Sequence, residues 1–141
     1  MNDKNRPLPK AVSLVLAGSF ALVGLAFLFI PSRVLAFFNR LSAAIGWPPL
    51  PVGEAFFFLI LAVAYMYLVT VLAWRMFRHP ENPTYPILLA HGKLASAVLS
   101  FGFFLARGPC LIFLVNGIID GLIGVGILFY CYFPSANLQA R

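Results

Sequence analysis

Two oppositely charged residues stand inside long apolar stretches, and they are the residue types best suited to chemistry there. Lys93 lies in the apolar run 86–106, and Asp120 lies near the middle of the apolar run 111–133. If these runs form antiparallel helices joined by a tight turn, Lys93 lies roughly 6 Å, about one helical turn, from Asp120 along the axis. Charges that are each costly in lipid are more stable when they face one another. The sequence therefore predicts an ion pair between Lys93 and Asp120 inside a helical bundle.

Polar and small residues flank both charges at helical spacing. Ser96 follows Lys93 by three residues, and Asn116 precedes Asp120 by four. Residues three or four apart share one face of a helix, so these side chains extend the polar stripe around the two charges. His91 is the only histidine within one of the apolar runs. The candidate intramembrane polar site therefore comprises Lys93, Asp120, His91, Asn116 and Ser96.

Three interpretations of this stripe remain open from the sequence. The polar groups can hold helices together without chemistry, since hydrogen bonds between helices stabilise packing in lipid. The Lys93 amine can instead extend to the headgroup layer, as long cationic side chains do. Ionisable groups inside a membrane can also line a pocket or a proton relay. For His91 we expect a structural hydrogen bond, because a single histidine cannot supply both axial ligands of a haem.

The composition explains how such charges come to lie in apolar surroundings. Of the 141 residues, 62% are hydrophobic and 10% are charged, and the mean hydropathy is +0.94. Soluble domains carry about 25% charged residues, and a helix that crosses a bilayer needs about 20 mainly apolar ones. Four such runs are present, at 11–30, 55–74, 86–106 and 111–133. We expect residues 1–141 to form a single membrane domain, an all-α integral membrane protein built as a four-transmembrane-helix bundle.

The connection between the first two spans is long and amphipathic. Residues 32–46 place apolar side chains on one helical face and arginines on another: Val34, Phe38, Leu41 and Ile45, against Arg33 and Arg40. This pattern is typical of a short helix that rests in the headgroup layer. Trp47 follows, and tryptophan is enriched at membrane interfaces. A packed re-entrant loop is the alternative structure for this segment.

The distribution of basic residues predicts the orientation of the chain, whose net charge is +6. With the N-terminus inside, six Lys and Arg residues lie on the cytoplasmic side and three on the other: Lys4, Arg6, Lys10, Arg75, Arg78 and Arg141, against Arg33, Arg40 and Arg107. Because cytoplasmic loops are enriched in Lys and Arg, both termini are expected in the cytoplasm. We expect a bacterial inner (cell) membrane. Glu54 and Arg107 then lie at the opposite interface, as a candidate interfacial pair.

Motifs of common catalytic and metal sites are missing from the sequence, including HExxH, the P-loop, GxSxG and CxxC. Cys110 and Cys131 lie at opposite ends of one run, roughly 30 Å apart, so no disulfide joins them. We expect no cofactor, no metal and no nucleic-acid partner, because the basic residues lie between apolar runs and form no patch. The expected partners are membrane lipids with anionic headgroups, together with further copies of this chain or another membrane protein.

The candidate functions fall into three classes. Four short spans also occur in small multidrug-resistance pumps, but those carry a glutamate in the first span, and the run 11–30 has no acidic residue. The general layout looks like small four-span bacterial proteins of the DoxX-like kind, and no motif carries a residue role across. We expect a non-enzymatic subunit, accessory or assembly partner of a membrane complex. The alternatives are a small transporter or channel component that uses Lys93 and Asp120, and a lipid- or quinone-binding membrane enzyme or redox partner.

Overall fold

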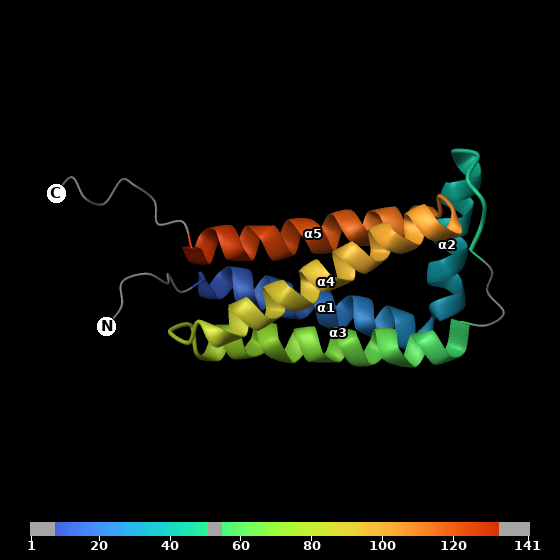
Figure 1. Ribbon diagram of the computed structural model, residues 1–141. Helices are drawn as coiled ribbons and strands as arrows, with labels where there is room; N and C mark the ends of the chain where they lie inside the picture. Colours follow the sequence, from blue (N-terminus) through green and yellow to red (C-terminus); the bar gives the residue numbers. More distant parts are fainter. Residues whose placement is uncertain (1–7, 51–54, 133–141) are drawn as a thin grey trace.

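The computed structural model describes residues 8–50 and 55–132, and within them it contains helices and no strand. The helices are α1 (Lys10–Phe29), α2 (Pro31–Ala44), α3 (Ala55–Arg78), α4 (Thr84–Arg107) and α5 (Leu111–Tyr132) (Figure 1). Helices α1, α3, α4 and α5 are long and apolar enough to cross a membrane. The prediction of an all-helical chain with four long apolar helices is confirmed. Helix α2 occupies the segment that the sequence predicts to be amphipathic.

Proline, asparagine and glycine residues set several helix ends. Pro31 is the first residue of α2, a position that tolerates its missing N–H group. The backbone N–H of Thr84 donates a hydrogen bond of 3.0 Å to Asn82 Oδ1, which satisfies one free donor at the start of α4. Gly108 has a φ of 107°, a conformation that glycine adopts without steric cost. It allows residues 108–110 alone to reverse the chain between α4 and α5.

The long helices pack as two antiparallel pairs, α1 with α3 and α4 with α5. Helix α4 starts beside α3 and crosses to α5 at the other end of the bundle (Figure 1). Contacts between α3 and α4 join the two pairs, whereas α1 and α5 share no extended contact within the described ranges. The start of α1, the end of α5 and the connection between α3 and α4 lie at one end of the bundle, and α2 lies at the other.

Glycines on α5 allow α4 to approach closely. A Cβ atom on Gly124 would lie 2.7 Å from Leu94 Cγ and 3.1 Å from the Ala90 carbonyl oxygen. A Cβ atom on Gly117 would lie 3.1 Å from the ring of Phe101. Small residues at such positions let helix backbones pack at short range. The close contact between α4 and α5 therefore requires glycine at these two positions.

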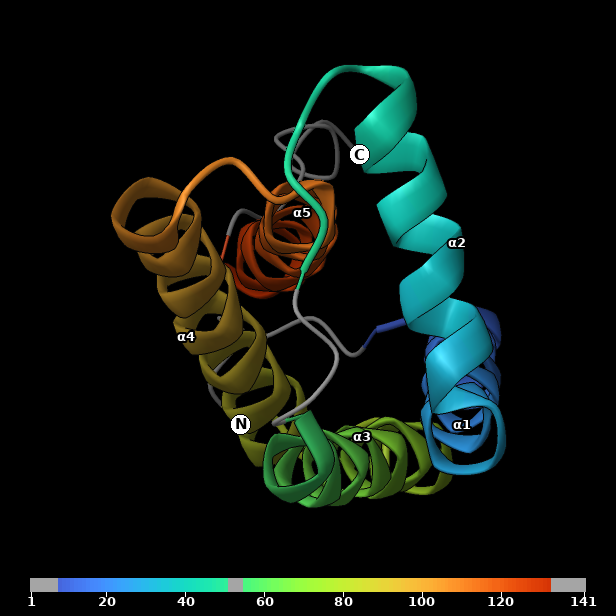
Figure 2. The same cartoon turned by 90° about the vertical axis from the view of Figure 1, so that its right-hand side faces the viewer.

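Helix α2 lies across the end of the bundle and bridges α1 and α5 (Figure 2). The backbone N–H of Leu111, the first residue of α5, donates a hydrogen bond of 3.3 Å to Ser42 Oγ. This contact satisfies one of the free donors at a helix start. The side chain of Asn39 binds the backbone N–H and C=O of Leu50, at 2.9 and 3.2 Å. The segment after α2 therefore folds back along it.

The face of α2 that packs on the bundle lies beside the apolar face that the sequence predicts for the headgroup layer. Leu35 and Ser42 are the buried residues of α2. On the predicted face, Leu41 and Ile45 are 41% and 53% exposed, while Val34 and Phe38 are half-buried. Helix α2 therefore keeps an apolar surface that the described residues do not cover.

The glycine contact predicts a difference between two neighbouring positions. Gly124→Ala is expected to lower the free energy of unfolding by about 1–3 kcal/mol, because the added methyl overpacks the contact with α4. Gly126→Ala is the matched control, since a Cβ there meets no described atom within 4 Å. It should leave stability unchanged or raise it by about 0.5–1 kcal/mol. Denaturation in mixed micelles measures both, and equal losses would contradict the predicted packing.

Candidate functional site

Lys93 and Asp120 form an ion pair in the core of the bundle. Lys93 Nζ lies 2.7 Å from Asp120 Oδ1, and it donates a hydrogen bond to that oxygen. The two residues are 2% and 3% exposed, so the pair is screened little by solvent ions. The structure thus contains the ion pair that the sequence predicts. The alternative in which the Lys93 amine extends to the headgroup layer is wrong for this structure, because the amine is enclosed.

Two aromatic rings from the other helix pair complete the surroundings of the amine. Lys93 Nζ lies 4.3 Å from the ring centroid of Phe20 on α1 and 5.3 Å from that of Tyr65 on α3. The face of an aromatic ring carries partial negative charge and attracts a cation at these distances. Lys93 of α4 therefore contacts residues of the three other long helices. The side chain of Lys93 thus links all four long helices.

A second group of hydrogen bonds continues from the ion pair towards the turn between α4 and α5. Asn116 Nδ2 donates to Ser100 Oγ at 2.8 Å and to Ser96 Oγ at 3.3 Å. Ser100 is buried, whereas Asn116 remains exposed. We call Lys93, Ser96, Ser100, Asn116 and Asp120 the polar column. Its members come from α4 and α5 alone, and they hold these two helices in register.

Two buried hydroxyl oxygens, Ser13 Oγ and Tyr65 Oη, lack a hydrogen-bond partner among the described residues. The Tyr65 hydroxyl lies beside Gly92, where a Cβ atom would be 3.8 Å from it. The hydroxyl nevertheless lies close enough to Ser96 and Asp120 to interact with both side chains. Tyr65 therefore presents its ring to the Lys93 amine and its hydroxyl to neighbouring polar groups.

The other predicted site residues lie outside the polar column. His91 is exposed, and its Nδ1 lies 2.8 Å from the carbonyl oxygen of Ile87 on the same helix. The expected structural hydrogen bond of His91 is thus present, but the residue points away from Lys93 because two residues turn a helix by about 200°. Arg107 is exposed at the end of α4. Glu54 lies outside the described residues, so its pairing with Arg107 stays a prediction.

The chemical capacity of the polar column follows from its groups: one amine, one carboxylate, one amide and two hydroxyls. These can hold helices together or pass a proton between neighbouring oxygen and nitrogen atoms. Cys110 and Cys131 are free thiols, and the described residues contain no group of three or more side chains that could hold a metal ion. No family model, curated protein or solved structure matches the chain.

Because the two charges are enclosed together, we expect removal of one of them to destabilise the protein more than removal of both. Asp120→Asn leaves the Lys93 cation enclosed without a counter-charge, and it is expected to lower the free energy of unfolding by about 3–5 kcal/mol. The double variant Lys93→Met/Asp120→Leu removes both charges and should recover most of that loss. Denaturation in mixed micelles measures the three proteins.

Val125→Thr provides the control, because Val125 is 58% exposed on α5 and its replacement has nearly the same shape. It should change stability little. If Asp120→Asn costs no more than Val125→Thr, the two charges are not coupled.

Proposed function

We propose that this chain is a four-span integral membrane protein that acts as a non-enzymatic subunit, accessory or assembly partner of a membrane complex. The observation that carries this proposal is the enclosed ion pair, with Lys93 in contact with Asp120, Phe20 and Tyr65. Both charges are neutralised within the bundle, and their contacts join all four long helices. Such an arrangement favours cohesion of a small membrane domain over turnover of a substrate.

The outward surfaces of the long helices support the membrane placement. Large apolar side chains are exposed on each of them, including Val15, Ile60, Leu105 and Leu122, at 67%, 67%, 82% and 70%. Water-soluble monomers rarely expose large contiguous apolar patches. In a membrane, acyl chains would cover these side chains and keep them out of contact with water. The apolar exterior and the charged interior together fit a bundle whose surroundings are hydrocarbon.

The charges at the two ends support one orientation in a bacterial inner membrane. Lys10 starts α1, while Arg75 and Arg78 end α3 at the same end of the bundle. By sequence, six Lys and Arg residues belong to this side and three to the other: Lys4, Arg6, Lys10, Arg75, Arg78 and Arg141, against Arg33, Arg40 and Arg107. An excess of basic residues favours the cytoplasmic side, so both termini are proposed to lie there. At the opposite end, α2 exposes Phe37, Leu41 and Ile45 together with its two arginines. An amphipathic helix across the bundle end suits the headgroup layer and anionic lipids.

Reporter fusions in a bacterial host test this orientation. A reporter that works only outside the cytoplasm is expected to be active after Gly108 and inactive after Asn82. A cytoplasmic fluorescent reporter should give the reverse pattern. The opposite result at both positions would contradict the proposed orientation, and identical results at both would contradict a membrane crossing by α4.

A second candidate function, a component of a small transporter or channel, is favoured by the exposure of Asn116. This polar side chain is exposed on an otherwise apolar helix, and its hydrogen bonds to Ser96 and Ser100 lead towards the ion pair. Ionisable residues inside membranes often mark ion or proton pathways.

Two measurements decide between these functions. Purification in mild detergent is expected to co-isolate another membrane protein in stoichiometric amount, and the Lys93→Met/Asp120→Leu variant should retain it. Liposomes that contain the purified chain and a pH-sensitive dye should show proton flux equal to that of empty liposomes. If the wild-type chain is isolated alone and carries a proton flux that a folded Asp120→Asn variant loses, the transporter function is correct and the accessory function is wrong.

A further inference from the structure

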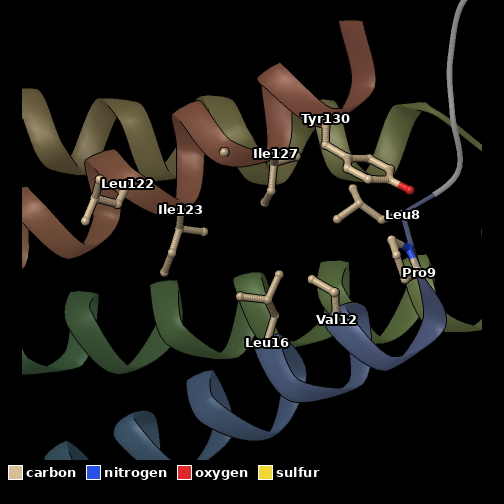
Figure 3. A pocket seen from close by; sticks show the side chains of 9 residues that line it. Leu8, Pro9, Val12, Leu16, Leu122, Ile123, Ile127 and Tyr130 are labelled. Carbon is tan, nitrogen blue, oxygen red and sulfur yellow. The ribbon is translucent and has the colours of Figure 1, made fainter. Parts of the chain in front are cut away.

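An apolar groove lies between α1 and α5, at the side of the bundle where these helices do not pack together. Its volume is about 270 Å³. Tyr130, whose ring carries a hydroxyl group, lies beside Leu8 and Pro9 at one end of the groove (Figure 3). The walls are apolar side chains of both helices, among them Leu8, Val12, Leu16, Ile123, Ile127 and Tyr130. Engineered apolar cavities of about 150 Å³ already bind benzene. The groove is therefore large enough to hold hydrocarbon.

The floor of the groove is buried and its rim is open to the side. Leu8 and Ile127 are 7% and 4% exposed, whereas Val12 and Leu122 are 42% and 70% exposed. An unfilled gap of this kind forfeits the dispersion contacts of its lining atoms. In a bilayer the groove opens directly towards acyl chains, which can enter sideways without crossing the protein.

The shape of the groove fits one hydrocarbon chain better than a helix. On α5 the lining residues Leu122 to Tyr130 extend over about 12 Å at a rise of 1.5 Å per residue. The groove's volume of about 270 Å³ is spread over that length. A helix with side chains is about 10–12 Å in diameter. A segment of such a helix about 12 Å long occupies roughly 900 Å³, so a single acyl chain fits the groove more readily than a helix of a second copy.

The charges at one end of the groove indicate the headgroup. Tyr130 and Leu8 lie at the end where α1 begins (Figure 3). Three exposed cations lie at this end, Lys10 at the start of α1 and Arg75 and Arg78 at the end of α3, beside one exposed carboxylate, Glu81. A headgroup above this end lies in a region of positive charge, which attracts anionic lipids.

We propose that the groove between α1 and α5 binds one acyl chain of an anionic phospholipid, with its headgroup at the end of the bundle that carries Lys10, Arg75 and Arg78. The proposal rests on the membrane placement argued above and adds a specific lipid site to it. The bound chain fills the gap between α1 and α5 and so completes the packing of the two helix pairs.

The test uses Gly126, which lines the groove and whose Cβ would meet no described atom within 4 Å. Gly126→Leu adds a side chain at the wall of the groove. Gly102→Leu is the matched control: Gly102 on α4 has the same open surroundings but does not line the groove. Each protein is reconstituted in bilayers of equal parts phosphatidylglycerol and phosphatidylcholine. Native mass spectrometry after gentle release then counts the retained lipids.

The wild-type chain and Gly102→Leu are expected to retain one phosphatidylglycerol molecule, and Gly126→Leu should reduce this retention at least fivefold. Equal retention by both variants would overturn the site. Equal retention of the two lipids by the wild-type chain would overturn its anionic preference. A wild-type dimer that only Gly126→Leu dissociates would instead assign the groove to a second copy. A separate experiment tests the membrane placement itself, by washing membranes that contain the wild-type chain with alkaline carbonate. Release of the chain into the wash would contradict the membrane placement.

Discussion

A cation and an anion enclosed in the core of a bundle are stable only in contact with one another, and this requirement governs the arrangement of the helices. Lys93 Nζ and Asp120 Oδ1 are 2.7 Å apart and nearly inaccessible. Separation of the two groups would leave each charge without compensation, which is far more costly than the loss of a surface ion pair. Helices α4 and α5 therefore have little freedom to slide or rotate against one another.

The rest of the bundle is built around that contact. Gly117 and Gly124 bring the backbone of α5 close enough to α4 for the short lysine–aspartate distance. Phe20 and Tyr65 then attach α1 and α3 to the same amine through their ring faces. Because α4 crosses from α3 to α5 (Figure 1), one side chain near its middle can reach both helix pairs. This crossing leaves α1 and α5 apart along the groove, where lipid is proposed to take the place of protein contacts.

Much of this structure follows from the sequence by simple physical rules. The apolar runs predict the long helices, and a turn at Gly108 fixes the offset that brings Lys93 opposite Asp120. The role of Phe20 could not be predicted, since it is one of 15 phenylalanines and no local pattern distinguishes it. The contact of Ser42 with the start of α5 also escapes the sequence pattern, because the two residues that it joins lie 69 positions apart. Local periodicity describes a helix surface but not the partner that covers it.

The most direct test of the account is a solid-state NMR measurement of the wild-type chain in bilayers, with nitrogen-15 in lysine side chains and carbon-13 in aspartate carboxyl groups. Lys93 is the only lysine within an apolar run, so its signal can be assigned by comparison with Lys93→Met. We expect a strong dipolar coupling between the Lys93 side-chain nitrogen and the Asp120 carboxyl carbon, as their hydrogen bond of 2.7 Å requires. A folded chain in which the Lys93 nitrogen shows no such coupling would contradict it.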